Sequence, residues 1–364
     1  MPAAGKIAVA MSGGVDSSTT AAMLVRAGEK VVGLTMRLCT PAGLDADGKP
    51  ASAAEADAAR VAAYLGIEHH VLDLRGEFER EVVRPFVASY LTGLTPCPCA
   101  LCNPRIKFGL LLEAAEALGA SRLATGHYAR IERGKGRFLL RRAADPARDQ
   151  SYFLFGLEQR QLAAALFPLG EFTKTRVREL AREWGLPVAE KSDSQEICFV
   201  PENDYASFVE AHSGLAGAGN DPPDASPGSA VGEGEIVTTS GRVLGRHAGI
   251  HRFTVGQRRG LNVAIGEPLY VVATDPATRR VIVGRNDELL RRSFRIRDAN
   301  WIAFDKQPAE FSAAVKIRNK HDAAPAVVRG DEVTFEEPQR AVTPGQAAVF
   351  YDGDLVLGGG WISR

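Results

Sequence analysis

The feature that most constrains this chain is a glycine-containing loop near its N-terminus. Residues 7–11 form a short apolar run, typical of a buried parallel strand. The string SGGVDSS follows at residues 12–18, and residues 17–27 have a helix-forming composition. Glycine lets the backbone approach a phosphate, and the N-terminus of a helix offers free N–H donors and a positive dipole end. The order strand, loop, helix therefore predicts a polyphosphate site at the edge of a parallel sheet.

Asp16 is unusual in such a loop, because a carboxylate repels a polyphosphate unless a cation lies between them. We therefore expect Asp16 to bind Mg²⁺. A lone Gly-Gly pair would favour a simple turn with an Asp N-cap, but the whole string after a buried strand does not. The loop lacks the lysine of a Walker loop and the spacing of the dinucleotide fingerprint. It is similar to the SGGxDS signature of pyrophosphate-loop ATPases, which implies that ATP is cleaved between its α- and β-phosphates and adenylates a substrate oxygen.

The first 130 residues alternate strand-like and helix-like segments, which predicts an α/β fold with a doubly wound parallel sheet. The further expected strands are 31–36, 69–74 and 122–126, and the further expected helices are 53–65, 77–91 and 106–118. Ligands of such folds bind beyond the carboxyl ends of the strands.

Beyond this region the pattern changes. Residues 129–142 predict a hairpin, and residues 173–184 predict a helix with Thr173 as its N-cap. Residues 214–228 are rich in Gly, Pro, Ala and Asp and predict a linker. From about residue 232 onward, short β-like runs predict a small β-rich linking domain and then a C-terminal β-barrel.

These segments suggest three domains, which suits a chain of 364 residues. We expect an ATP-binding catalytic domain at 1–207, a central linking domain at 208–275 and a C-terminal β-barrel at 276–364. No apolar run reaches the ~18 residues that span a bilayer, and the N-terminus is unlike a signal peptide. We therefore expect a cytoplasmic protein without a membrane partner.

The formal net charge is zero, so composition alone does not predict a nucleic-acid binder. Arginines crowd residues 122–148 and 279–297. Each stretch alone is typical of a solvated face, whereas the two together favour a polyanionic ligand.

The chain has five cysteines, at positions 39, 97, 99, 102 and 198. In a cytoplasmic protein, three cysteines within six residues indicate reactive thiols or a metal site rather than a disulfide framework. We expect Cys102 to lie in a loop just before the 106–118 helix, where the helix N-terminus, Arg105 and Lys107 would lower its pKa. The thiolate is the nucleophilic form of cysteine. Cys97 is expected to be incidental, and Cys198 alone would be interpreted as a core residue.

Two other strings favour a functional site. Gly126-His127-Tyr128-Ala129-Arg130 follows the fourth expected strand, so His127 should face the same crevice as ATP. The string that begins at Asp149 and Gln150 follows the arginine-rich hairpin and is a candidate for substrate contact.

Seven strings occur in one order from residue 10 to about residue 351: AMSGGVDSS, CNPRIKF, TGHYAR, RDQSYFLF, KSDSQEICFV, FTVGQRRGL and TPGQAAVFY. Together they resemble the bacterial tRNA-specific 2-thiouridylase family over nearly the whole chain. The resemblance implies an adenine nucleotide alpha hydrolase-like sheet and a tRNA-uridine 2-sulfurtransferase. It also implies partners: tRNA and a sulfur-relay protein, with no DNA. We expect a monomer.

The mechanism implied by the resemblance has two stages. ATP adenylates the C2 oxygen of a flipped-out wobble uridine, because a carbonyl oxygen is a poor leaving group. Sulfur from a persulfide on Cys198 then attacks C2, and AMP leaves. Cys102 assists, either by attacking the persulfide to form a disulfide or after reductive release of sulfide.

The resemblance also assigns residues to roles. Those expected to bind ATP are Ala10, Met11, Ser12, Gly13, Gly14, Val15, Asp16, Ser17, Met36 and Gly126. Those expected to contact tRNA are His127, Arg148, Asp149, Gln150, Arg318, Asn319 and Gln346. Cys102 would be the nucleophile and Cys198 the persulfide carrier.

One departure from the family pattern concerns the cysteine string. The family loop usually has the form PNPDxxCN, whereas here it is Pro96-Cys97-Pro98-Cys99-Ala100-Leu101-Cys102-Asn103. If the family's Asp acts as a base or orients the uracil, then either Cys99 takes over this catalytic role as a thiolate or the role moves to another residue. An alternative stays open, in which Cys99, Cys102 and Cys198 bind an iron–sulfur cluster or zinc.

Two rival functions remain at this point. Another pyrophosphate-loop enzyme, one that amidates its substrate, would use ammonia and would not need Cys102 or Cys198. A non-catalytic RNA-binding or redox protein would tolerate the loss of Asp16.

Overall fold

The computed structural model describes residues 5–39, 53–192, 197–215, 231–263 and 266–364. The chain forms two compact units. Unit 1 is 1–79, 99–199 and 354–356, and unit 2 is 80–98, 200–353 and 357–364. The expected linker at 214–228 lies outside the described residues except for its first two positions. The expected boundaries at 207 and 275 stay predictions.

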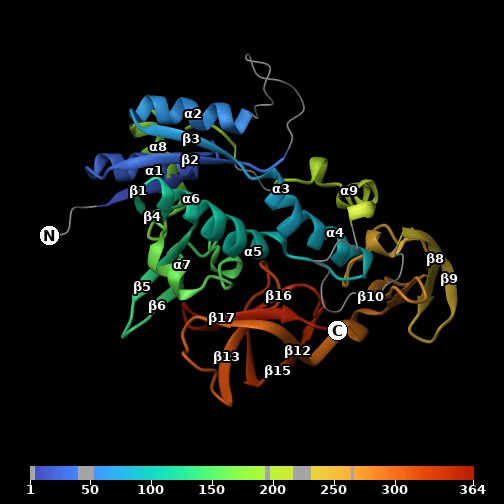
Figure 1. Ribbon diagram of the computed structural model, residues 1–364. Helices are drawn as coiled ribbons and strands as arrows, with labels where there is room; N and C mark the ends of the chain where they lie inside the picture. The colour runs from blue at the N-terminus through green and yellow to red at the C-terminus, as the bar shows by residue number, and fades with distance from the viewer. Residues whose placement is uncertain (1–4, 40–52, 193–196, 216–230, 264–265) are drawn as a thin grey trace. The chain divides into compact units, whose positions relative to one another are not determined.

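Unit 1 contains the parallel sheet that the sequence predicts, with the strand order β3-β2-β1-β4-β7 (Figure 1). The strands are β1 Lys6–Ala10, β2 Val31–Arg37, β3 Glu68–Asp73, β4 Ala120–Ala124 and β7 Ala165–Leu166. All four neighbouring pairs are parallel. β7 was not predicted, because two residues are too few to show a period.

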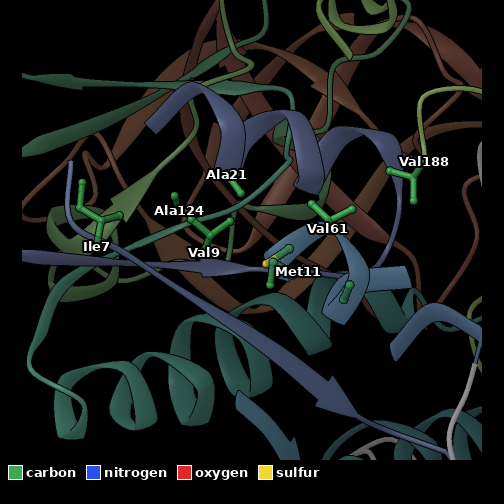
Figure 2. Close-up of a cluster of buried hydrophobic side chains, with 9 residues drawn as sticks. Ile7, Val9, Met11, Ala21, Val61, Ala124 and Val188 are labelled. Atoms are coloured by element: carbon green, nitrogen blue, oxygen red, sulfur yellow. The ribbon is translucent and has the colours of Figure 1, made fainter. Parts of the chain in front are cut away.

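Helices cover the sheet, as expected of a doubly wound fold. α1 (Val15–Arg26) packs against the sheet, α2 (Ala53–Leu65) and α8 (Lys174–Glu183), while α6 (Leu111–Ala117) packs against β4 and β2. Figure 2 shows one buried cluster between these layers, in which Val9, Met11, Ala21 and Val61 gather. Because each of these residues is 2% exposed or less, their burial fixes α1 and the loop before it on the sheet.

Two expected helices are partly π-helical, each with a proline near the π-helical stretch. The segment expected at 77–91 is α3 (Arg75–Phe78), a π-helical turn (Glu79–Val83) and α4 (Arg84–Leu91). Pro85 stands at the start of α4, and its missing N–H cannot continue the α-helical hydrogen-bond ladder.

The cysteine segment contains the other π-helical stretch. It is α5 (Pro98–Cys102), a π-helical stretch (Asn103–Leu110) with Pro104 near its start, and then α6. The expected loop over residues 97–103 is therefore wrong. The helical segment begins at Pro98, and Cys102 lies inside it rather than before it.

The expected hairpin and the expected helix after it are both confirmed. β5 (Ala129–Arg133) pairs with β6 (Phe138–Arg142). Thr173 caps α8 by accepting a hydrogen bond from the Arg176 N–H, and Gly185 follows the helix in the left-handed region at φ +62°. Between these elements lie the 3₁₀ turn η3 (Ser151–Phe153) and α7 (Gln159–Ala164).

Unit 2 contains the predicted β-rich region and one helix that was not predicted, α9 (Tyr205–Ala211). A four-stranded sheet has the order β10-β11-β8-β9. Its strands are β8 Val231–Thr238, β9 Val243–Gly249, β10 Tyr270–Asp275 and β11 Arg280–Gly284.

The predicted C-terminal barrel is confirmed, with the strand order β12-β15-β14-β13-β16-β17 closed by a β12–β17 pairing. Its strands are β12 Leu290–Trp301, β13 Glu310–Lys316, β14 Ala324–Arg329, β15 Glu332–Arg340, β16 Ala347–Asp352 and β17 Leu355–Ile362. Among the described residues, no helix combines the length and the apolar character needed to cross a bilayer.

Candidate nucleotide and thiol site

The predicted phosphate loop lies between β1 and α1 and is held in shape by its own hydrogen bonds. Gly13 has φ +68°, and a Cβ at this position would collide with the Ala54 carbonyl, so no other residue fits. The Ser12 N–H donates to Ser17 Oγ at 3.2 Å, and Ser18 Oγ donates to the Gly14 carbonyl at 2.8 Å. These hydrogen bonds and the tight packing at Gly13 fix the shape of the loop.

Asp16, in the first turn of α1, already has two partners. The Lys174 ammonium lies 2.7 and 2.8 Å from its two carboxylate oxygens, and the Tyr128 hydroxyl donates to Oδ1 at 2.8 Å. Across the described ranges, no three His, Cys, Asp or Glu side chains are grouped so that they could hold a metal ion. Binding of Mg²⁺ by Asp16 stays a prediction, and such an ion would share the carboxylate with Lys174.

A second lysine supports the loop from outside. Lys191 Nζ donates to the Gly13 carbonyl at 3.0 Å and lies 2.5 Å from Asp57 Oδ2. Sequence reasoning missed both lysines as site residues. Lys174 directly follows the predicted N-cap and Lys191 opens the string KSDSQEICFV, but nothing in the sequence indicates what either ammonium contacts.

The residues expected beside the adenine lie at strand ends next to this loop. Met36 is at the carboxyl end of β2, where Thr35 Oγ1 donates to the Met11 carbonyl at 2.8 Å. Gly126 follows β4, and a Cβ there would lie 2.8 Å from the Ser17 nitrogen. The structure thus brings Gly126 against the first turn of α1, so close that a side chain would force the backbone to move.

His127 joins the loop region to the cysteine segment. Its Nδ1 lies 2.7 Å from Thr125 Oγ1, and its Nε2 lies 3.4 Å from Lys107 Nζ. Because an ammonium only donates, Nε2 is the acceptor and Nδ1 carries the proton. Burial and the nearby Lys107 charge hold the pKa of His127 well below its ordinary value, so the ring is neutral at pH 7.

Cys102 differs from the expectation in the direction of its pKa shift. It is buried at the end of α5, and this burial raises the pKa of its thiol. The Lys107 charge lowers the pKa by a smaller amount. The predicted helix N-terminus is absent, because the chain is already helical from Pro98, so the expected thiolate is wrong for the free protein.

Cys198 lies in the same cluster of thiols, although it is about ninety-six positions away in the chain. The residue is exposed, yet desolvation of its thiol raises the pKa to about 12, with smaller contributions from Cys102 and Cys99. Lys107 opposes these contributions. The Lys107 charge acts on the thiols of Cys99, Cys102 and Cys198 alike, so these three residues belong to one electrostatic neighbourhood.

Neighbouring contacts hold this cluster in place. Phe199 packs edge-on against Phe78, with ring centroids 5.4 Å apart. Asn103 is 1% exposed and donates to the Phe153 carbonyl at 2.8 Å, while its Oδ1 has no hydrogen-bond partner. Cys39, which follows β2, also acts electrostatically on Cys198. Cys97 is buried, as expected of an incidental cysteine.

The other residues expected to contact tRNA in unit 1 lie around η3. Arg148 is exposed. Asp149 Oδ1 accepts from the Ala143 and Ser151 N–H groups at 3.1 Å, and Gln150 Oε1 accepts from the Tyr128 N–H at 2.9 Å. Asp149 and Gln150 therefore hold the turn in shape, and their contact with tRNA stays a prediction.

The remaining expected tRNA contacts lie in unit 2. Arg318 donates to the Arg340 carbonyl at 3.1 Å, and Asn319 lies in the turn after β13. Gln346 donates to the Thr95 and Pro96 carbonyls at 2.9 and 3.1 Å. The Gln346 amide thus supports the segment that leads into the cysteine string.

A cavity of about 480 Å³ in unit 1 lies outside this constellation. It is lined by residues of β4, the β5–β6 hairpin, α7 and β7, including Arg122, Arg133 and Phe167. Neither the phosphate loop nor any thiol lines it, so it does not define the reacting centre.

Three family models match the chain. The tRNA methyl transferase HUP domain matches residues 5–202, the tRNA methyl transferase PRC-barrel domain matches 228–285, and the Aminomethyltransferase beta-barrel domain matches 291–362. A curated protein of Solibacter usitatus, named tRNA-specific 2-thiouridylase MnmA, is 55% identical over 98% of both chains. A protein of the same name from Acidobacterium capsulatum is 51% identical over 98% of both chains.

Solved structures are more distant. NMN synthetase from Francisella tularensis has a TM-score of 0.35 and 17% identity, and the match covers 62% of this chain and 81% of that one. The U34-tRNA thiolase NcsA from Methanococcus maripaludis, solved with its [4Fe-4S] cluster, also has a TM-score of 0.35 and 17% identity, over 58% of this chain and 66% of that one.

Proposed function

The chain belongs to the tRNA-specific 2-thiouridylase family, and we propose that it replaces the C2 oxygen of a tRNA wobble uridine with sulfur at the expense of ATP. The observation that carries this proposal is a series of neighbours from the phosphate loop to Lys107, whose charge acts on the thiols. Gly126 presses on the first turn of α1, its neighbour His127 reaches Lys107, and Lys107 acts on Cys99, Cys102 and Cys198.

The first step is adenylation. The uracil C2 oxygen attacks the α-phosphorus of ATP, the bond to the β-phosphate breaks, and pyrophosphate leaves. A carbonyl oxygen becomes a good leaving group once it is bonded to AMP. The uridine has to be extruded from its stack to reach the loop.

The second step is sulfur transfer. A sulfur-relay protein loads Cys198 as a persulfide. The Cys102 thiolate attacks the Cys198 sulfur, so that a Cys102–Cys198 disulfide forms and the terminal sulfur leaves as hydrosulfide. Hydrosulfide adds to C2, AMP leaves with the original oxygen, and a proton is lost to give 2-thiouridine. If a reductant frees the sulfide instead, no disulfide forms.

The family model carries the description of a methyl transferase, whereas the curated relatives are named for thiolation. The site supports thiolation. Methyl transfer from a sulfonium donor needs neither a loop whose free N–H groups suit phosphates nor the thiols of Cys102 and Cys198.

An iron–sulfur cluster does not fit the thiols as they are placed. In the described part of the chain, no group of three or more potential ligands is arranged to hold a metal. We therefore route no step through a cluster. The absorption spectrum of anaerobically purified protein tests this choice, because a cluster absorbs visible light and free thiols do not.

Several finer points belong to the same proposal. ATP acts with Mg²⁺, for which Asp16 is the predicted ligand. The protein acts as a monomer in the cytoplasm, where its tRNA substrate is found. Arg318, Asn319 and the barrel are predicted to bind the RNA.

The deciding experiment mixes the protein with ATP, Mg²⁺, unmodified tRNA and a sulfur source, and measures thiolated uridine by mass spectrometry of nucleosides. We expect product with wild type and none with Asp16→Ala. Cys198→Ser should fail with a persulfide donor and work with free sulfide. Full activity of Asp16→Ala would remove the ATP-loop assignment, and a product aminated at C2 would support the amidating rival.

A further inference from the structure

Lys174 is a buried lysine whose charge reaches the phosphate loop from 158 positions away in the chain. Its side chain is 9% exposed, and its ammonium contacts both oxygens of Asp16. Two interactions hold the backbone of Lys174 in place. Its own N–H donates to Asp145 Oδ2 at 3.0 Å, and Thr173 caps the helix that it begins.

The helix that carries Lys174 is anchored to the helix that carries Asp16. Val177 and Ala181 of α8 are fully buried, and they pack in one cluster with Val15 and Ala22 of α1. The distance between Lys174 and Asp16 is therefore set by the core and not by flexible surface chain. This packing positions an ammonium group at the first turn of α1.

Stability alone does not explain a buried charge in this place. Removing the Lys174 ammonium from water carries a desolvation penalty, and apolar pairs of similar volume are often as stable as a buried ion pair. The pair also sits where the free N–H groups of α1 face a ligand. A function that needs the charge explains its burial better than a structural role does.

The loop itself lacks a cation that could meet a phosphate. Its sequence, SGGVDSS, has no counterpart to the Walker lysine. Lys191 is directed elsewhere, to the Gly13 carbonyl and Asp57. At the first turn of α1, among the residues that the structure describes, the Lys174 ammonium is the cation within hydrogen-bonding distance of the Asp16 carboxylate.

We propose that Lys174 is a phosphate-binding residue, whose ammonium turns from Asp16 to the phosphate oxygens when ATP occupies the loop. It would supply from α8 the positive charge that a Walker loop carries within itself. Asp16 keeps the Tyr128 hydroxyl as a hydrogen-bond donor after the exchange. The proposal rests on the proposed use of ATP, but it does not depend on tRNA or sulfur.

The test measures ATP affinity of the full-length protein by calorimetry, without tRNA. Lys174→Met keeps the length of the side chain and removes its charge, so we expect ATP to bind at least about tenfold more weakly, and Lys174→Arg to recover part of the loss. Affinity for adenosine, which has no phosphates, should be unchanged. Arg182→Met, an exposed change on the same helix, is the matched control and should bind both ligands as wild type does.

A double-mutant cycle separates phosphate binding from simple neutralisation of Asp16. If Lys174 binds phosphate, Lys174→Met weakens ATP binding by a similar factor in wild type and in an Asp16→Asn background. If Lys174 only neutralises Asp16, the change has no effect once Asp16 is Asn. The second result would overturn the proposal, as would equal losses of ATP and adenosine affinity.

The cycle also covers the case in which Lys174→Met alone does not fold. The double variant, Asp16→Asn with Lys174→Met, leaves no unpaired charge at this place. Comparing its ATP affinity with that of Asp16→Asn still shows whether Lys174 binds phosphate. A wild type that binds ATP but makes no thiolated uridine would refute the proposed function and leave this inference standing. A wild type that does not bind ATP would refute both.

Discussion

The phosphate loop and the thiol cluster lie in the same unit, yet the free protein holds their charges in opposite ways. At the loop the Asp16 carboxylate is paired, because the Lys174 ammonium and the Tyr128 hydroxyl bond to it. At the cluster charge is suppressed, because burial raises the pKa of the Cys102 and Cys198 thiols more than Lys107 lowers it. The phosphate loop is thus arranged to bind its ligand, while the thiols of the cluster have to lose protons before they can react.

This difference suits the order of the proposed reaction. ATP and the uridine come first and need an ordered loop with matched charges. The thiols come second, and a protonated thiol is protected from oxidation and from premature attack. Loading of a persulfide, or the approach of the tRNA, would then change the environment of the cluster.

The largest expected effect is a difference in thiolation rate between variants of Cys102 and Cys97, two cysteines that are five positions apart. Cys102→Ser should lower the single-turnover rate of thiolation at least about a thousandfold, because serine is a far weaker nucleophile at neutral pH. Cys97→Ser should change it less than about twofold, since that buried thiol has no role in the proposed steps. Rates are measured with quenched samples and nucleoside mass spectrometry. Equal losses in the two variants would show that the cluster acts only through packing.

The second-largest expected effect concerns the phosphate loop and is tested at Gly126. Gly126→Ala places a Cβ 2.8 Å from the Ser17 nitrogen, so the first turn of α1 has to shift. Overpacking of this kind has an energetic effect of about 1–3 kcal/mol, which corresponds to roughly 5- to 150-fold weaker ATP binding. The matched control is Gly76→Ala, where a Cβ meets nothing within 4 Å. Equal ATP affinity in both variants would mean that the ligand does not use the edge between β4 and α1.

The third expectation concerns the rate at which the Cys198 thiol is alkylated, which depends on its protonation. Because the Cys198 pKa is raised to about 12, iodoacetamide should alkylate this thiol slowly at pH 7, although it is exposed. The rate should rise about tenfold per pH unit and should still be rising at pH 9.5. Peptide mapping at each pH gives the rate. A plateau near pH 8 would instead show a reactive thiolate in the free protein.

The smallest effect concerns His127. Its pKa is depressed in the folded state, so the unfolded chain binds more protons and stability is lost as the pH falls below the ordinary value of 6.5. The contribution is at most about 1.4 kcal/mol per pH unit. His127→Gln should remove that part of the slope in urea unfolding measured between pH 5 and 7. An unchanged slope would place the ring in a solvated setting.

The sequence was most informative where local pattern and function coincide. The loop, the βα order, the hairpin and the Thr173 cap follow from short strings whose geometry is set by neighbours in the chain. β7 could not be predicted, because a two-residue strand is defined by its partner β4. The π-helical turn before Pro85 was not predicted, because the apolar spacing continues through Pro85 while the hydrogen-bond ladder does not.

The sign of the Cys102 pKa shift shows a different kind of limit. Arg105 and Lys107 are visible in the sequence, so a lowered pKa seemed to follow from local charge. Burial is a tertiary property, and here it has the larger effect. The Lys174 contact was missed for the same reason, since its partner lies 158 positions away.

A single-turnover experiment can measure whether Cys102 and Cys198, which are far apart in the chain, take part in the same reaction. Protein carrying a persulfide on Cys198 is mixed with ATP and tRNA without reductant, digested, and its disulfide-linked peptides are quantified against thiolated uridine. We expect one Cys102–Cys198 disulfide for each thiolated base. Thiolated tRNA formed while Cys102 remains free, or a Cys198 disulfide to Cys39 instead, would contradict the proposed sulfur transfer.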